Sequence, residues 1–186
     1  MNKSLVAVML IALLIVSCTK EKKQDPFQIG KQHIGLLTDS TQVKDLELAF
    51  PTDSIVKNIM GDEFSGSVND IEIYDTSSGK PLLILTPTQA LDSTAKIKSI
   101  HIKDSRYKTD KNISSISTFS DIKNNYKISG IATLINSVVI SVNEINASFT
   151  IDKKELPANL QFNMDLKIEA VQIPDNAKIK YFMLYW

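Results

Sequence analysis

The chain has 186 residues, 21 basic and 21 acidic side chains, and a single cysteine. Proteins that bind nucleic acid do so through clustered Lys and Arg, so this balanced charge argues against a nucleic-acid partner. One cysteine cannot form an intramolecular disulfide, and core packing must therefore stabilise the folded part. The length suits one domain or two small repeats.

Residues 1–17 predict a lipoprotein signal peptide. Lys3 precedes an unbroken apolar run over residues 5–16. A helix of that length is about 18 Å long, against about 30 Å of membrane hydrocarbon, which favours a cleaved segment. The run closes with the lipobox-like Ile15-Val16-Ser17-Cys18. We predict that Cys18 carries a lipid. The alternatives are an ordinary secretory signal or an uncleaved helix, with Cys18 incidental.

Residues 18–26 predict a tether between the lipid and the folded body. They contain several charged residues and almost no apolar ones, and they end at Pro26. Such a segment cannot bury enough apolar surface to fold. We therefore expect a protein that is held to the outer membrane through Cys18. Its periplasmic or surface side stays open, because the residues after Cys18 fit poorly the acidic tag of some surface lipoproteins.

The remaining sequence contains one pattern twice, which predicts two repeats at residues 27–109 and 110–186. Residues 41–50 align without gaps to residues 117–126. Apolar residues at positions i, i+3 and i+7 indicate a helix at the start of each repeat, and hydroxyl and acidic residues precede both runs as helix caps do. Ala95-Lys96-Ile97-Lys98 recurs as Ala177-Lys178-Ile179-Lys180, each before a final strand. The unequal spacing indicates an insertion near residues 153–163.

Alternating apolar residues predict further strands between each helix and each final strand. We therefore predict an α+β fold of two tandem helix-plus-antiparallel-sheet repeats, with the helices packed on one face of the sheet. The strand signals lie at residues 71–74, 82–85, 138–142, 147–151 and 166–170.

The last strand is apolar on both of its faces. Phe182, Leu184 and Trp186 point to one side, and Tyr181, Met183 and Tyr185 point to the other. One interpretation is that the second set packs against the other repeat, the insertion or the N-terminal segment. The other is an exposed face for a partner protein, because Tyr and Met are enriched where proteins bind.

This order of elements resembles the RpoE-regulated outer-membrane lipoproteins, a family whose domain has no assigned function. The resemblance implies an envelope lipoprotein with a repeated α+β fold, and it supplies no catalytic residue. The chain departs from the family in lacking a second cysteine. A looser likeness is to the helix-plus-sheet modules of the β-lactamase inhibitor proteins and of the small lipoprotein in the outer-membrane assembly machine, which bind proteins. The resemblance rests on the lipobox, Ile34-Gly35-Leu36-Leu37 before Ser40-Thr41, the strand at 96–104, the helix signal at 117–122, and the strand from Ala177 to Trp186.

The sequence carries no recognisable catalytic motif. His33 and His101 lack the short spacings of a zinc site, although a site built from both stays open. Neither a Gly-x-Ser-x-Gly elbow nor a glycine-rich phosphate loop is present. The carboxylates that lie close in sequence, Asp62 with Glu63 and Asp70 with Glu72, are more typical of turns and surfaces than of acid–base catalysis. We predict no enzyme, no cofactor and no metal.

Three tripeptides match a glycosylation pattern of exported proteins in some Bacteroidota. They are Asp39-Ser40-Thr41, Asp53-Ser54-Ile55 and Asp92-Ser93-Thr94. Each tripeptide is also typical of a cap or a turn, so both readings stay open.

The sequence therefore predicts a lipid-anchored envelope protein without catalytic activity. We expect a protein-binding or scaffold module that contacts another envelope protein through an open sheet face including Tyr181, Met183 and Tyr185. The alternative is a carrier of a small apolar ligand or lipid between sheet and helices.

Overall fold

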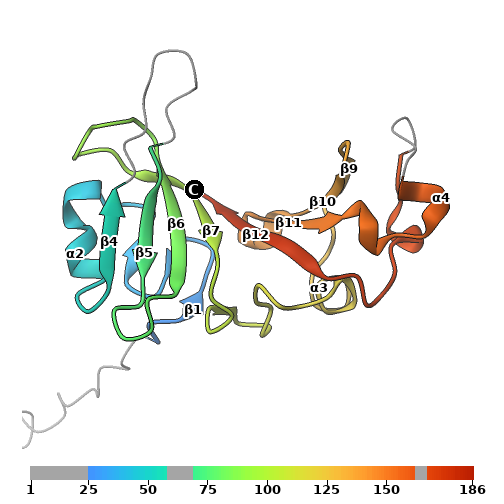
Figure 1. Ribbon diagram of the computed structural model, residues 1–186, viewed down its shortest axis with the longest axis horizontal. Helices are drawn as coiled ribbons and strands as arrows, with labels where there is room; N and C mark the ends of the chain where they lie inside the picture. Colours follow the sequence, from blue (N-terminus) through green and yellow to red (C-terminus); the bar gives the residue numbers. More distant parts are fainter. Residues whose placement is uncertain (1–24, 58–68, 162–166) are drawn as a thin grey trace, which may run out of the picture.

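The computed structural model describes residues 25–57, 69–161 and 167–186. Its main element is an eight-stranded antiparallel sheet with the order β4-β5-β6-β7-β12-β11-β10-β9, which extends across the whole molecule (Figure 1). The strands are β4 (Ser54–Lys57), β5 (Ile71–Tyr74), β6 (Pro81–Pro87), β7 (Ile97–Ile102), β9 (Gly130–Thr133), β10 (Ser137–Val142), β11 (Ala147–Asp152) and β12 (Ile179–Tyr185).

The two halves of this sheet follow the same plan. In the first half, the 3-10 helix η1 (Val43–Asp45) and α2 (Leu46–Ala49) precede the four strands β4 to β7. In the second half, α3 (Phe119–Asn125) precedes β9 to β12. Matching isolated bridges join the start of each helical segment to the start of each final strand, Gln42 to Lys96 and Thr118 to Lys178. The final strands β7 and β12 then pair with each other at the centre of the sheet.

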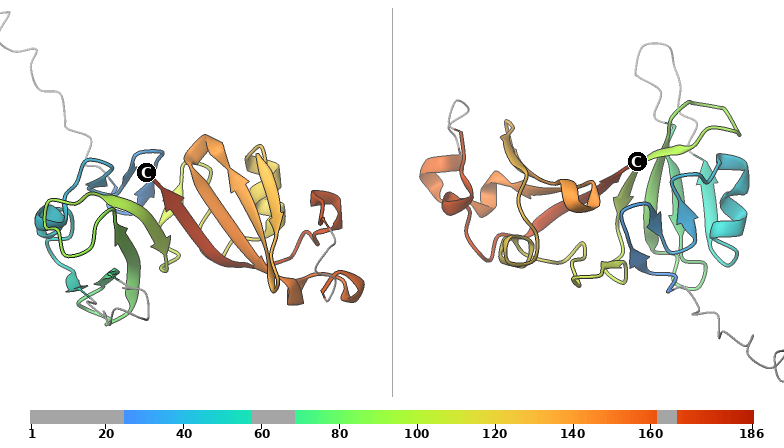
Figure 2. Two further views of the ribbon diagram at one scale, coloured as in Figure 1. Left: turned by 90° about the horizontal axis from the view of Figure 1, so that it is seen from above. Right: turned by 180° about the vertical axis from the view of Figure 1, so that it is seen from behind.

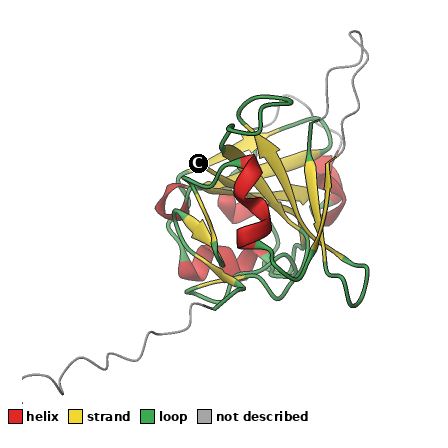
Figure 3. Ribbon diagram, turned by 90° about the vertical axis from the view of Figure 1, so that its left-hand side faces the viewer, coloured by secondary structure: helices red, strands yellow, loops and turns green. Residues whose placement is uncertain are grey.

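The predicted α+β class is wrong, because the chain is mostly β. The described residues form twelve strands in two sheets, against three α-helices of four, seven and four residues (Figure 3). The helical spacing at residues 43–50 and 119–126 is satisfied by one or two turns that fill the core, rather than by a layer of helices on a sheet face. The apolar residues that recur at positions i, i+3 and i+7 in these turns are buried: Val43, Leu46, Phe50, Phe119, Ile122 and Tyr126.

The linker between β11 and β12 holds short helical turns. It contains η3 (Lys153–Glu155), α4 (Ala158–Gln161) and η4 (Ala170–Gln172). The prediction of a strand at residues 166–170 is wrong for the residues that the structure describes. Residues 167–169 do not form a strand, and Ala170 begins η4. Residue 166 lies outside the described residues. Ile168 is buried, so its apolar character reflects core packing and not strand alternation.

One row of apolar side chains crosses all eight strands on the core face of the sheet. Neighbours in this row are directly opposite each other, and Phe149 and Phe182 stack with ring centroids 4.6 Å apart. Six of its members are fully buried, while those on the two edge strands are half-buried. The row consists of Ile55, Ile73, Leu83, Ile102, Phe182, Phe149, Ile140 and Ile131.

A second, four-stranded sheet packs against the first half of the molecule and is formed mainly by the N-terminal segment (Figure 2). Its strand order is β3-β2-β1-β8, and its apolar side chains Ile29, Ile34 and Leu37 are buried in the common core. Gly35 has a φ of +54°, and a Cβ atom there would overlap the Pro26 carbonyl, so this turn requires glycine. The strands are β1 (Gln28–Ile29), β2 (His33–Ile34), β3 (Leu37–Thr38) and β8 (Lys108–Thr109).

Both final strands carry a β-bulge at the same place. Ile97 and Ile100 are both buried although they are three residues apart, which an unbroken strand would place on opposite faces. A register shift at Thr86/Pro87 in the pairing of β6 with β7 allows both to face the core. The equivalent shift at Thr150/Ile151 does the same for Ile179 and Phe182 in β12.

The single arginine of the chain connects the N-terminal segment to the turn between β5 and β6. The Arg106 guanidinium contacts Asp75 at 2.8 Å and Asp104 at 3.0 Å. The same group lies over the Phe27 ring, 4.7 Å from its centroid. Hydrogen bonds from the Ser77 hydroxyl and from Arg106 hold the pKa of Asp75 well below its usual range.

We predict that Asp75→Asn reduces the decrease in the free energy of unfolding that the protein shows as the pH falls below about 5. The pKa of Asp75 is lower in the folded state than its unfolded value of 3.8, so the unfolded state takes up its proton first as the pH falls. The stabilisation is therefore complete above the unfolded pKa and is lost as the pH falls toward the folded one. Urea denaturation at several values between about pH 5 and pH 3 would measure the slope. A variant with the wild-type slope would contradict this assignment.

Candidate protein-binding face

The sheet face opposite the core row is here called the outer face. One row on it consists of Glu72, Ile84, His101, Met183, Ser148 and Ser141, which are aligned across β5 to β10. A second row consists of Tyr181, Thr150, Val139 and Ala132 and reaches the edge strand β9. The helices and the small sheet contribute their buried side chains to the core on the other face.

The outer face is hollowed where β7 meets the strands β12, β11 and β10 of the second half. This outer-face hollow is open and shallow, with a volume of about 430 Å³. Tyr181 and Tyr185 are 42% and 46% exposed, while Met183 between them is half-buried. The three residues of the last strand therefore lie together on the outer face and do not pack in the described core. The lining consists of His101, Val139, Ser148, Thr150, Tyr181, Met183 and Tyr185.

Cross-strand contacts fix the two tyrosines. His101 of β7 meets Tyr181 edge-on, with ring centroids 5.2 Å apart. The hydroxyl groups of Tyr185 and Ser148 are 3.0 Å apart and share a hydrogen bond. The Lys180 ammonium lies 5.5 Å from the Tyr181 ring centroid and forms an ion pair with Asp152 at 2.9 Å. Each ring is thus oriented by its neighbours while part of its surface stays accessible.

Burial keeps His101 neutral. Desolvation is the main reason that the pKa of His101 is lowered to about 4, and repulsion by Lys103 adds to it while Asp70 opposes it. The hollow therefore presents a neutral imidazole, two phenols, a thioether and hydroxyl groups at neutral pH. Such a lining offers apolar contact and hydrogen bonds but no charge of its own.

A second depression, the N-terminal groove, lies between the N-terminal segment and the first half. It has a volume of about 560 Å³, and Phe27, Leu36 and Phe50 contribute its apolar surface. Arg106 and Asp75 also line it, but they are paired with each other. Burial and the nearby Asp75 carboxylate raise the pKa of Asp53 in the same groove.

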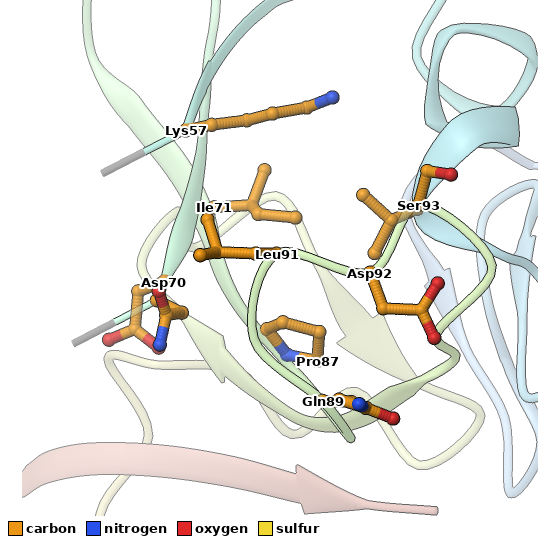
Figure 4. Close-up of a pocket in the computed structure, with 10 residues that line it drawn as sticks. Lys57, Asp70, Ile71, Pro87, Gln89, Leu91, Asp92 and Ser93 are labelled. Atoms are coloured by element: carbon orange, nitrogen blue, oxygen red, sulfur yellow. The ribbon is translucent and has the colours of Figure 1, made fainter. Parts of the chain in front are cut away.

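A third pocket lies beside the loop after β6 (Figure 4). Leu91 and Ile71 form part of its apolar wall, and Lys57, Asp70 and Asp92 stand around it. Its volume is about 160 Å³, which is below the range of about 300–1,000 Å³ that small-molecule sites occupy.

The residues considered for chemistry are occupied with local structure wherever they are described. Asp70 accepts a hydrogen bond from Thr86 at 2.7 Å, and Glu72 accepts one from the Tyr74 hydroxyl. His33 lies in β2 of the small sheet, while His101 is on the outer face of the large one. Cys18, Asp62 and Glu63 lie outside the described residues. No group of three or more His, Cys, Asp and Glu residues in the described part of the chain is arranged to hold a metal ion.

The three tripeptides of the glycosylation pattern lie at the surface. Their central serines, Ser40, Ser54 and Ser93, are all exposed. In the third tripeptide, Asp92 accepts hydrogen bonds from the backbone and the hydroxyl of Thr94, at 2.8 and 2.7 Å, as in an Asx turn.

Sequence reasoning missed the residues that complete the hollow. Ser148 and Thr150 come from β11, which pairs with β12, and Val139 comes from β10, the next strand in the sheet, and this strand order was not predicted. His101 is added to the hollow by the pairing of β7 with β12, which no local pattern in the sequence indicates.

Comparison with known proteins supports the fold alone. No protein-family model and no curated protein matches the chain. A solved structure, the uncharacterized protein yfeY from Escherichia coli, is similar with a TM-score of 0.56 and 14% sequence identity, over 86% of this chain and 99% of that one. Within the described ranges, none of the helices is both long and apolar enough to cross a membrane.

We predict that His101→Gln reduces the pH dependence of stability between about pH 6.5 and pH 4. The folded-state pKa of about 4 lies below the unfolded value of 6.5. As the pH falls through this window, the unfolded state binds the proton and is favoured, so the stabilisation is full above pH 6.5 and lost toward pH 4. Allowing for partial exposure to solvent, we expect an effect on the order of 1 kcal/mol. Urea denaturation of both proteins at the two ends of the window measures the difference, and parallel profiles would contradict it.

Proposed function

We propose that this protein is a non-catalytic, lipid-anchored lipoprotein of the outer membrane that binds another envelope protein through its outer face. The observation that supports the binding role is the outer-face hollow, in which Tyr181 and Tyr185 are exposed beside Met183. Tyr and Met are among the residues enriched at protein interfaces. Aromatic residues held by their neighbours also lose little side-chain entropy on binding, which favours them as anchors.

The chemistry of the hollow fits a protein partner better than a small substrate. It is open and shallow, whereas small-molecule sites enclose most of their ligand. None of the described residues that line it carries a charge at neutral pH. The mixture of apolar and hydroxyl surface matches the core and rim of a transient protein interface.

The anchoring role rests on Cys18 and on the short tether. Asp25, the first described residue, follows Cys18 by seven residues, and a fully extended chain of that length spans at most about 25 Å. A lipid on Cys18 would therefore hold the folded body within about one domain diameter of the membrane. This restriction is the reason that we propose an envelope protein as the partner. The similarity to the RpoE-regulated outer-membrane lipoproteins is part of the same proposal.

The alternative function is a carrier of a small apolar ligand or lipid. The N-terminal groove is the observation in its favour, because its volume of about 560 Å³ is within the range of small-molecule sites. The test is binding of a fluorescent fatty acid to the protein. Loss of binding in Leu36→Trp, together with unchanged binding in a variant of the outer face, would support this alternative.

We predict that native protein begins at Cys18 and carries acyl chains. Intact-mass spectrometry of protein extracted from membranes measures both properties. Cys18→Ser should release the protein from the membrane fraction or leave it unprocessed, since the thiol is the site of attachment. A native chain that begins at Met1 without a lipid would contradict the anchor.

We predict that the double variant Tyr181→Ser/Tyr185→Ser keeps its fold and loses its partner. Both side chains are partly exposed, so we expect a loss of stability of only about 1–2 kcal/mol, which includes the shared Ser148 hydrogen bond. A photocrosslinking residue at Val139, on the wall of the hollow, should form an adduct with one envelope protein in native membranes. The double variant should lose that adduct.

The matched control for this experiment is Leu48→Ser/Val171→Ser. These apolar side chains are 77% and 87% exposed on α2 and η4, away from the outer face. The control should retain the adduct. An adduct that persists in the tyrosine variant, or one that both variants lose equally, would contradict binding through the hollow.

A further inference from the structure

The strand β9 ends the large sheet, and part of its backbone faces away from it. β9 pairs with β10 and is the last strand in the sheet order. The Leu134 N–H donates to the Ser137 carbonyl at 2.8 Å, which fixes the phase of the hydrogen-bonded ladder in this hairpin. In an antiparallel pair, alternate residues form the hydrogen bonds to the partner strand. Ile131 and Thr133 therefore direct their N–H and C=O groups to the side on which no strand of the described residues pairs with β9.

Nothing in the sequence of this edge discourages pairing with another strand. Residues 129–137 contain neither a charged residue nor a proline. Natural proteins protect exposed edges with such residues, and the opposite edge of the same sheet has Lys57 in β4 and Pro51 shortly before it. Two apolar side chains beside β9, Leu134 and Ile135, are 51% and 68% exposed.

We propose that β9 pairs with β9 of a second copy of this chain, antiparallel and centred on Ala132. Ile131 and Thr133 both direct their backbone groups outward. Ile131 of each copy would therefore form a hydrogen-bonded pair with Thr133 of the other copy. Four backbone hydrogen bonds would form in all, and Ala132 would lie opposite its own equivalent in a non-hydrogen-bonded pair. This contact is isologous, as the two-fold symmetry of most homodimers requires.

The side chains of this edge are complementary to themselves about Ala132. Gly130, Ala132 and Leu134 alternate onto the outer face, so Leu134 of one copy would lie opposite Gly130 of the other. A Cβ atom at Gly130 would meet no atom within 4 Å, so there is open space for that leucine. On the core face, Ile131 would lie opposite Thr133, a pairing of two β-branched side chains. The Thr133 hydroxyl accepts a hydrogen bond from the Ile168 N–H of its own copy at 3.1 Å, so its methyl group would make this contact. A partner of unrelated sequence would not in general match this small–small–large pattern.

The dimer would carry both hollows on the same side. Ala132 of one copy meets Ala132 of the other on the outer face, so the two-fold axis is perpendicular to the sheet. The sheet therefore continues from one copy into the other. Two four-residue edge strands bury less area than the about 1,200 Å² of a stable interface, so the pairing is transient in dilute solution. Confinement to a membrane raises the effective concentration and would favour it there.

The experiment uses the full chain in native membranes, with Ala132→Cys as the probe. Non-hydrogen-bonded pairs bring Cα atoms to about 4.5 Å, within the reach of a disulfide, so mild oxidation should give a product of twice the mass. The unsubstituted chain reports any contribution from Cys18. Ser54→Cys, which is exposed on the opposite edge strand, reports random collision.

Charge variants at the same position separate pairing from misfolding. Ala132 is exposed, so Ala132→Lys and Ala132→Glu should each fold and remain monomeric, because like charges would meet at the axis. Placing the two variants in the same membrane should restore a dimer that a chemical crosslinker captures, and Ala132→Thr should be captured as a dimer alone.

The proposal is overturned if Ala132→Cys crosslinks no more than Ser54→Cys. It is also overturned if the crosslinked product contains a different protein, or if the Lys and Glu variants fail to recombine while Ala132→Thr dimerises. None of these outcomes depends on the tyrosine hollow, so the dimer and the proposed function can fail separately.

Discussion

Antiparallel pairing of β7 with β12 joins the two halves, and the core and the outer face both depend on it. On the core face it sets Phe182 against Ile102 and Leu184 against Ile100, and all four are buried. On the outer face the same register sets Met183 against His101. A shift of one residue would exchange the two sets of side chains and place the phenylalanine in water. The register that buries the core row therefore also determines which side chains lie together in the hollow on the outer face.

The N-terminal segment is coupled to this sheet at one point of mixed polar and aromatic contact. β1 pairs in parallel with β8, and Arg106 just before β8 reaches back to Asp75 and covers Phe27. Tyr107 meets the Phe27 ring edge-on at 5.1 Å. An N-terminal anchor would therefore connect to the body through the first half, while the residues that line the hollow come mostly from the second half.

The sequence predicted those parts of the fold in which apolar residues alternate or recur at a regular helical spacing. The alternation at residues 71–74 and 138–142 corresponds to β5 and β10, and the residues Phe119 and Ile122 are buried as their helical spacing indicated. It did not predict the fold class, because a spacing of i, i+3 and i+7 is equally satisfied by one or two short helical turns in a mostly β protein. Strands of two residues, such as β1, are too short to show any period.

The candidate site was predictable only in part for a related reason. Tyr181, Met183 and Tyr185 are neighbours along one strand, so alternation alone places them on one face. Val139, Ser148, Thr150 and His101 join them through strand order, which is a long-range property that local patterns do not encode. The bulge at Thr150/Ile151 is also invisible in the sequence, yet it sets the phase of Tyr181 relative to Ile179.

The composition of the outer face is compatible with the proposed reversible binding of a partner. A wholly apolar face of this size would favour aggregation, whereas a charged one would be strongly hydrated and costly to desolvate. Here half-buried Met183 alternates with exposed tyrosines along β12, and hydroxyl residues from β11 separate the apolar ones. Each apolar contact is thus small, and the hydroxyl groups of Tyr185 and Ser148 already share a hydrogen bond in the free protein. A partner would need to replace only the water above two oriented rings, which favours reversible binding over permanent assembly.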